Sequence, residues 1–372
     1  LAAPTGRAAK RMTEATGYEA KTIHRLLEVS GGIEDGDSSH FEKNEDNPIE
    51  ADAVILDEMS MVDIHLMYSL LKAIVPGTRL ILVGDSNQLP SVGPGNVLKD
   101  IIDSKAFSVV RLSKIYRQAE SSHIVLNAHK INAGELITLD NKNKDFFFFE
   151  KKDVRSVMGA LVYLVKTRLP EYIGASPFEI QVLTPMRKGE LGVEHLNEVL
   201  QYYLNPASES KKEKEGRTGV FREGDKVMQV KNNYKLEWKI TNAKGFSIEE
   251  GLGVFNGDMG IIKQINTYSE RITVVFDENR EAEYPFSSLD ELELAYAITI
   301  HKSQGSEYPA VVLPLLSGPP ILCNRNLLYT AITRAQKCVA IAGRQSMVEQ
   351  MIHNETEQKR YSGLNVCLKE GL

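Results

Sequence analysis

The first part of the chain alternates short apolar runs with segments of helical periodicity. Ala53–Leu56 and Arg79–Asp85 are apolar runs of strand length, of the kind found in strands buried on both faces. Val62–Val75 lies between them with a helical pattern and can supply the crossover that two parallel strands need. Val97–Ile102 is a further helical segment, and Val109–Leu112 a further strand. The pattern predicts an α/β unit with a parallel sheet.

The same strand–helix alternation returns in a second unit. Asp145–Glu150 and Glu179–Thr184 read as strands, and Val154–Leu169 and Gly192–Leu204 as helices. Ser121–Ala133 reads as a helix that Gly134 ends. After an interruption, apolar sequence resumes at Leu292. The later elements of this unit are strands at Ala310–Leu316 and Val339–Ala342 and helices at Asn326–Ala335 and Gln345–His353.

The interruption has a different composition and period. Asn205–Gly219 is rich in Ser, Lys and Glu, has no apolar period and predicts a flexible linker. The period then changes from 3.6 to 2, with a hairpin-type turn at Asn256–Asp258. Four short strands follow from this pattern: Asp225–Val230, Met259–Ile265, Arg271–Asp277 and Glu281–Tyr284.

These patterns divide the chain into two α/β domains with an insertion in the second. We expect a first domain over residues 1–134, in which 28–50 is a polar segment with room for a small hairpin. Residues 135–204 and 291–372 then form the second domain, 205–219 the linker, and 220–290 a small inserted β-barrel.

Net charge, cysteine spacing and the length of apolar runs limit which partners the chain can bind. The 372 residues carry a net charge of −6, so any nucleic acid would have to bind a local basic groove. The three cysteines are widely spaced, show no metal spacing and suit a reducing cytosol. No apolar run approaches the length of a membrane helix, and no signal peptide is visible.

Candidate chemistry gathers where the first two strands end. Asp57 and Glu58 follow the first strand directly, and Gln88 lies in a Gly-rich loop after the second. Because carboxyl ends of parallel strands share one edge of a sheet, they can form a ligand crevice. A carboxylate there can hold Mg²⁺ and its neighbour can reach a different atom. The alternative is a strand that ends in a solvated acidic turn.

The residue sequences of these motifs resemble those of superfamily one helicases. The resemblance is strongest to the RecD-like branch, which includes the alpha subunit of exodeoxyribonuclease five. Asp57-Glu-Met-Ser60 and Gly84-Asp-Ser-Asn-Gln-Leu-Pro90 are similar to the second and third motifs of that family. Further similar segments follow in the family's order: Ala3–Ala9, Thr22–Leu26, Ile115–Gln118, Val182–Arg187, Thr299–Glu307 and Tyr329–Arg334.

The resemblance implies two RecA-like domains of the P-loop NTPase type, with a barrel of the Src-homology-three kind in the second. ATP and Mg²⁺ would bind between the two domains. Asp57 would organise Mg²⁺, Glu58 would position or deprotonate the attacking water, and Gln88 would sense the γ-phosphate. Arg117 and Arg334 would stabilise charge together, with Gly305 and Glu307 near the nucleotide.

The resemblance also implies a path for single-stranded DNA, followed 5′ to 3′, and work at junctions of duplex and single strand beside other recombination subunits. The residues it assigns to this path are Pro4, Thr5, Gly6, His24, Thr184, Pro185, Thr299 and His301. The 28–50 segment would hold the hairpin that splits the duplex. On the barrel, basic and aromatic residues interleave in a way that suits single-stranded DNA or a solvated face: Lys226, Lys231, Tyr234, Lys235, Trp238, Lys239 and Lys244.

One motif of the family is absent from these residues. The sequence contains no Gly-x-x-x-x-Gly-Lys-Ser/Thr, which the family places about one βα unit before the equivalent of Leu1. We therefore expect a carboxyl-terminal portion, with a first domain truncated at its N-terminus, that is inactive alone. Three interpretations stay open: a helicase motor in recombination and repair, the helicase part of a conjugative relaxase, and a non-catalytic DNA-binding module.

Overall fold

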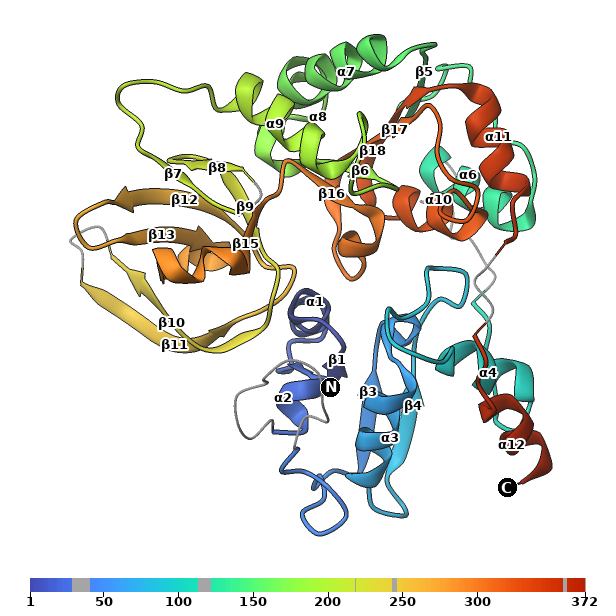
Figure 1. Cartoon of the computed structure of the whole chain (residues 1–372). Helices are drawn as coiled ribbons and strands as arrows, with labels where there is room; N and C mark the ends of the chain where they lie inside the picture. Colours follow the sequence, from blue (N-terminus) through green and yellow to red (C-terminus); the bar gives the residue numbers. More distant parts are fainter. Residues whose placement is uncertain (29–40, 113–121, 218, 243–245, 357–359, 372) are drawn as a thin grey trace. The chain divides into compact units, whose positions relative to one another are not determined.

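The computed structural model describes residues 1–28, 41–112, 122–217, 219–242, 246–356 and 360–371. The chain divides into two compact units (Figure 1). The first comprises Leu1–Arg117, Gln304–Ser306 and Thr356–Leu372, and the second Gln118–Ser303 and Glu307–Glu355. No helix in the described ranges is both long and apolar enough to cross a membrane.

A four-stranded parallel sheet forms the centre of the first unit. Its order is β2-β1-β3-β4, from Lys21–Thr22, Ala2–Ala3, Ala53–Leu56 and Arg79–Leu82. The helices of this unit are α1 (Gly6–Thr16), α2 (Ile23–Leu26), α3 (Ile64–Lys72), α4 (Val97–Ser104) and α12 (Leu364–Glu370), with a 3₁₀ turn at Met59–Met61. The predicted parallel pair and its crossover helix are confirmed.

Two predictions for this unit are wrong. Neither β3 nor β4 is buried on both faces. In β3, Val54 and Leu56 are buried but Ala53 is exposed. β4 is the edge strand of the sheet in the described residues, and Ile81 is 40% exposed. Val109–Leu112 forms no strand: Val110 and Leu112 are 86% and 95% exposed. No described strand pairs with them, so nothing buries their side chains. Lys21 and Thr22 form the two-residue strand β2, which leads directly into α2.

The second unit has a five-stranded parallel sheet with the order β16-β6-β17-β18-β5. These strands are Ala297–Thr299, Ile180–Thr184, Tyr308–Leu315, Ala335–Gly343 and Phe146–Glu150. The helices are α6 (His123–Ala133), α7 (Val154–Tyr163), α8 (Leu169–Ile173), α9 (Val193–Leu204), α10 (Arg325–Ile332) and α11 (Gln345–His353), with a π-helical stretch at Leu164–Arg168. The helices α7, α8 and α9 lie along one side of this sheet in Figure 1. The predicted strands and helices alternate as expected, and β16 is a further strand that the pattern did not predict.

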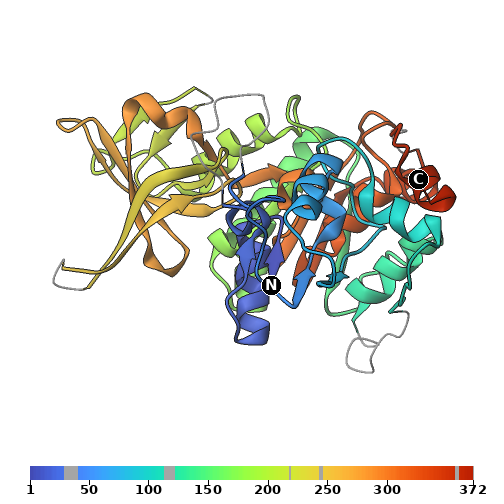
Figure 2. The ribbon, with the colours of Figure 1, turned by 90° about the horizontal axis from the view of Figure 1, so that it is seen from below.

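The inserted domain of the second unit is a seven-stranded antiparallel sheet with the order β11-β10-β14-β13-β12-β9-β15. In chain order from β9 to β15 the strands are Lys226–Gln229, Asn233–Thr241, Ser247–Val254, Met259–Asn266, Arg271–Phe276, Glu281–Pro285 and Leu292–Leu294. The four predicted strands are present. The strands β10 and β11 extend from the rest of the sheet as a long ribbon (Figure 2).

The sequence missed three strands of this sheet, which are β10, β11 and β15. β10 and β11 are rich in exposed charged residues, which hide their period. Asn256–Asp258 joins β11 to β12, which are not neighbours in the sheet, so it is not a hairpin turn. The segment expected as a linker contains β7 (Glu213–Glu215), which pairs with β8 (Val220–Arg222).

A buried carboxylate joins the barrel to the α/β part of the second unit. Asp225 is fully buried and accepts four hydrogen bonds: from Gln201 Nε2 and the Arg222 amide, both at 2.6 Å, from Asn205 Nδ2 at 2.7 Å and from the Tyr296 hydroxyl at 2.9 Å. Gln201 lies on α9 and Asn205 directly follows it. Removing the carboxylate would therefore leave several buried donors without an acceptor.

We expect Asp225→Ala to lower the free energy of unfolding of the second unit by about 3 kcal/mol, because each unsatisfied buried donor costs free energy. Urea unfolding followed by circular dichroism measures this change. Glu249→Ala, at an exposed position on β11, is the control and should stay within about 0.5 kcal/mol of the unaltered chain. Equal stability of both variants would show that the buried hydrogen bonds contribute nothing.

Candidate functional site

The two adjacent carboxylates stand at the end of β3, as the sequence predicts. The Asp57 amide donates to the carbonyl of Ala2 on β1 at 3.0 Å, which extends the sheet by one residue. The backbone then turns at Glu58, whose φ of 53° and ψ of 39° lie in the left-handed region that residues other than glycine seldom adopt. The Glu58 amide also donates to Asp57 Oδ1 at 2.7 Å. This turn separates the paths of the two neighbouring side chains.

The segment after β4 leaves the same edge of the sheet. Leu56 pairs with Leu82, and the amide of Met59 donates to the carbonyl of Val83 at 3.0 Å. Gly84 is required at this crossing, because a Cβ there would come within 2.9 Å of the Met59 nitrogen. The two post-strand segments are therefore in direct contact, which brings the acid pair and the Gln88 loop together.

The two polar atoms of the Gln88 side-chain amide differ, because only the nitrogen makes a hydrogen bond. Its Nε2 donates to Asp85 Oδ2 at 3.4 Å, and Asp85 also accepts from the Asn87 amide at 2.9 Å. Gln88 Oε1 is buried and accepts no hydrogen bond. Such an atom usually has a water or ligand donor in the functional state. The arrangement suits a group that meets a nucleophilic water or a phosphate.

The acid pair fits a magnesium nucleotide better than a protein-enclosed metal. No group of three or more His, Cys, Asp or Glu side chains that could hold an ion is present among the described residues. Mg²⁺ is commonly held through one or two carboxylates, with waters and substrate phosphates as its other ligands. Asp57 is half-buried and can supply such a carboxylate.

Thr5 and Gly305, which the resemblance assigns to DNA and to the nucleotide, lie side by side in the first unit. The Thr5 hydroxyl caps α1 by accepting from the Ala8 amide at 3.2 Å. Gly305 has a φ of 70°, and a Cβ there would come within 2.6 Å of Thr5 Oγ1. Arg7 NH1 adds a hydrogen bond to Ser306 Oγ at 3.2 Å. Pro4 and Gly6 flank this contact.

The sequence predicts that Arg334 lies on the helix Asn326–Ala335, but it lies just past the end of the helix that forms. The helix α10 ends at Ile332, and Arg334 is only 3% exposed before β18 begins. Its carbonyl accepts from the Tyr308 amide at 2.8 Å, which fixes the backbone. Glu307 accepts from Gln336 Nε2 at 3.2 Å. Arg117 lies outside the described residues, so its pairing with Arg334 stays a prediction.

The remaining residues predicted to contact DNA differ in how far their side chains are exposed to solvent. Thr184 is fully buried and donates to the Leu191 carbonyl at 2.7 Å, and Pro185 is buried beside it. These two positions shape their loop and present no side chain to a ligand. Thr299 accepts from the Lys302 amide at 3.3 Å, and His301 is exposed.

The two histidines of this set have perturbed acidity. Partial burial lowers the pKa of His24, against the opposing charge of Asp63. Surrounding protein atoms likewise lower the pKa of His301 by desolvation. Both imidazoles are therefore mainly neutral at neutral pH and can contact a nucleic acid by hydrogen bonding or stacking. Residues 29–40 of the 28–50 segment lie outside the described residues, so the predicted hairpin stays a prediction.

The prediction of a basic and aromatic face on the barrel is wrong for Lys226 and Trp238, whose side chains are turned into the protein. Lys226 is buried and donates to the Phe178 carbonyl at 2.7 Å and to Gln181 Oε1 at 2.8 Å. Trp238 is half-buried and packs on the core. Three further members differ from one another: Tyr234 lies edge-on to Phe255, Lys231 pairs with Asp290, and Lys244 lies outside the described residues. Lys235 and Lys239 remain exposed on β10.

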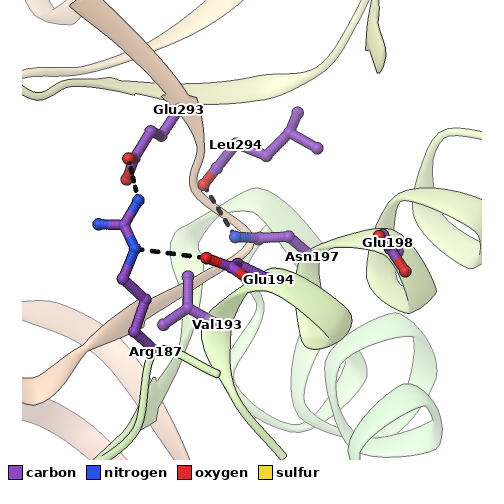
Figure 3. Close-up of a pocket in the computed structure, with 7 residues that line it drawn as sticks. All are labelled: Arg187, Val193, Glu194, Asn197, Glu198, Glu293 and Leu294. Carbon is purple, nitrogen blue, oxygen red and sulfur yellow. Dashed lines mark hydrogen bonds and ion pairs between the residues drawn. The ribbon is translucent and has the colours of Figure 1, made fainter. Parts of the chain in front are cut away.

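An ion-pair cluster lines a shallow pocket that sequence reasoning missed (Figure 3). Arg187 contacts Glu293 at 2.5 Å and Glu194 at 3.5 Å, and Lys302 Nζ contacts Glu293 at 3.2 Å. Burial would raise the pKa of Glu293, but Lys302 and Arg187 outweigh it and hold that pKa below its usual range. Glu293 thus ties together Val182–Arg187 and Thr299–Glu307. No spacing signal predicts this link.

Three family models match the chain in order. Residues 1–94 match an AAA domain, residues 196–276 the SH3 domain of ATP-dependent RecD-like DNA helicases, and residues 294–342 a UvrD-like helicase C-terminal domain. The middle match covers most of the inserted antiparallel sheet.

Similar proteins agree with these models. The chain is 36% identical over 92% of its length to the ATP-dependent RecD2 DNA helicase of Deinococcus radiodurans. It is 30% identical over 99% of its length to the RecBCD enzyme subunit RecD of Mycolicibacterium smegmatis. It spans 42% and 66% of the lengths of these two relatives.

A solved structure shows the same fold. The crystal structure of a Pif1 helicase from Bacteroides in complex with ADP-AlF3 and single-stranded DNA matches with a TM-score of 0.52 and 20% identity. It covers 94% of this chain and 83% of that one. The two parallel sheets and the antiparallel insert are thus two RecA-like domains with an SH3-like insertion.

Proposed function

Because the chain belongs to the RecD-like DNA helicases, we propose that it is the motor portion of an ATP-dependent helicase that moves 5′ to 3′ along single-stranded DNA. One observation carries the proposal. The sheet of the first unit delivers Asp57, Glu58 and the Gln88 loop to one edge, with Gln88 Oε1 buried and ready to accept a donor. Recombination and repair, beside other subunits at junctions of duplex and single strand, is the proposed setting.

Each residue of this edge has a proposed task. Asp57 would hold Mg²⁺ through its carboxylate, and Mg²⁺ bound there would neutralise charge on the phosphates. Glu58 orients the attacking water and takes its proton. Gln88 contacts the terminal phosphate or the water. Arg117 and Arg334 stabilise charge in the transition state, and Gly305 and Glu307 lie near the nucleotide.

Single-stranded DNA is the proposed track. The start of α1 presents the backbone N–H groups of Thr5 and Gly6, where a phosphate can bind, and Thr5 keeps its hydroxyl proton for a further bond. His24, Thr299 and His301 extend the proposed path. The backbone of the Thr184–Pro185 loop replaces the side chains as the contact there. Residues 1–372 lack the phosphate-loop motif, so strong ATP binding requires that motif to be supplied.

We expect residues 1–372 to bind single-stranded DNA with an affinity that falls as salt rises, because released counterions drive such binding. Thr5→Ala and His301→Ala should each weaken binding by about tenfold, the loss expected for one hydrogen bond to a charged group. The salt slope should change little at pH 7.5, since neither side chain carries a charge there. Fluorescence anisotropy with a labelled oligonucleotide measures both quantities.

Two matched variants control for general damage. Thr16→Ala lies at the other end of α1, and His353→Ala at the end of α11. Both should bind DNA like the unaltered chain. Unchanged affinity in Thr5→Ala and His301→Ala together would remove these residues from the DNA path.

A further inference from the structure

The Gln88 loop has no regular secondary structure, so individual hydrogen bonds from other segments fix its position. Between β4 and α4, residues 83–96 form neither helix nor strand. Gln304 Nε2 donates to the Leu89 carbonyl at 2.7 Å, and the Ile64 amide donates to the Pro94 carbonyl at 3.0 Å. These bonds hold two points of the loop, one of them next to Gln88.

Arg360 makes the densest set of contacts to this loop. Its NH1 donates to the carbonyls of Gly93 and Gly95 at 2.5 and 2.8 Å and to Ser91 Oγ at 3.2 Å, and its NH2 donates to the Ser91 carbonyl at 2.5 Å. One guanidinium therefore binds four oxygens within five residues. A planar fork of donors can do this, whereas the ammonium of lysine cannot match the same geometry.

The segment that carries Arg360 is anchored on the first unit independently of the loop. The helix α12 packs on α4, and Leu364 lies against the hydrophobic core. Asn365 Nδ2 donates to the Asp100 carbonyl at 3.2 Å. Arg360 thus extends from a fixed support to the loop. The guanidinium is part-buried, which strengthens its hydrogen bonds relative to those of an exposed side chain.

We propose that Arg360 is a positioning residue for ATP turnover, which holds the loop in the place where Gln88 meets the nucleotide. The inference rests on the proposed function. Ser91 lies three positions after Gln88, so a shift of Ser91 is transmitted through a short stretch of chain. The side-chain amide of Gln88 is held by a long bond from its Nε2 to Asp85 Oδ2 at 3.4 Å, which resists such a shift weakly. The carboxyl-terminal segment then sets the geometry of the site although it contacts no substrate.

Hydrogen exchange of residues 1–372 tests the anchoring. Arg360→Ala should raise amide exchange in peptides that cover residues 85–96 at least tenfold and leave peptides over β3 unchanged. Arg360→Lys should restore only part of the protection. Asn365→Ala, which removes a bond of α12 without touching the loop, should leave the loop protected. Equal loop exchange in Arg360→Ala and the unaltered chain would overturn the inference.

Kinetics test the effect on catalysis in a phosphate-loop fusion, a protein in which a βα unit containing Gly-x-x-x-x-Gly-Lys-Ser/Thr is joined to Leu1. Arg360→Ala should lower kcat for DNA-stimulated ATP hydrolysis by roughly 10- to 100-fold, as expected for a misplaced group, with KM for ATP within about twofold. Asn365→Ala should keep kcat. A raised KM at unchanged kcat would overturn the positioning role.

Different results would contradict the proposed function and the positioning role of Arg360. A fusion that binds DNA but never hydrolyses ATP would contradict the proposed function, while the exchange experiment would still decide whether Arg360 holds the loop. A fusion that hydrolyses ATP equally well with and without Arg360 would overturn the inference and leave the function intact.

Discussion

Glu58→Gln in the phosphate-loop fusion is expected to lower DNA-stimulated ATP turnover by roughly 10³-fold, within the range that a lost general base allows. The amide keeps the size of the side chain and can still contact a water, but it cannot take a proton. Nucleotide binding should stay within about threefold, because Asp57 and the phosphate loop are intact. Steady-state hydrolysis and binding of a fluorescent nucleotide measure the two effects.

Glu50→Gln is the matched control for this change. Glu50 is exposed and lies shortly before β3, on the side of the strand opposite its carboxyl end. The same chemical substitution there should leave turnover unchanged. Full activity of the Glu58→Gln fusion would show that another group activates the water.

Arg334→Ala in the same fusion is expected to lower turnover by roughly 10³-fold, the lower end of the range for an arginine that stabilises phosphoryl charge. Because Arg334 is buried, its loss can also weaken packing. Arg334→Lys keeps a charge and most of the stem, yet it should recover little activity, since lysine lacks the planar fork. Turnover and the melting temperature are measured together.

Lys337→Ala is the control, at an exposed position three residues further along. It removes a cation and should keep full activity. If Arg334→Ala lost activity only in step with its melting temperature, and Arg334→Lys were fully active, the residue would be structural. Cross-linking or a new structure that separates Arg334 from Arg117 would also contradict the paired role.

The sequence was most informative where burial and motif coincide. Ala53–Leu56 is continuous, apolar and bounded by acids, so both its strand and the edge it supplies could be predicted. The parallel sheet of the second unit could be predicted equally well, because Ile180–Thr184 is buried along its whole length and is therefore apolar over most of it. In these regions local pattern and tertiary burial point to the same structure.

The sequence failed where the role of a residue depends on distant partners. Lys226 reads as a surface cation, but Gln181 and the Phe178 carbonyl hold it inside. Thr184 belongs to a family motif, yet its hydroxyl is used within its own loop.

Long-range pairs were equally hidden. Arg187 and Glu293, and Arg360 and the Gln88 loop, are pairs separated by more than a hundred residues. No local period encodes such contacts, because they follow from topology alone.

DNA-stimulated ATP hydrolysis by residues 1–372 and by the phosphate-loop fusion, measured side by side, tests the central claim most directly. Lysine and backbone donors of the phosphate loop share the transition-state charge, and losing one preorganised donor can cost roughly 3 kcal/mol. We expect background turnover for residues 1–372, and turnover by the fusion that rises with single-stranded DNA. Robust hydrolysis by residues 1–372 alone, or a well-folded fusion that binds DNA and ATP without hydrolysis, would contradict it.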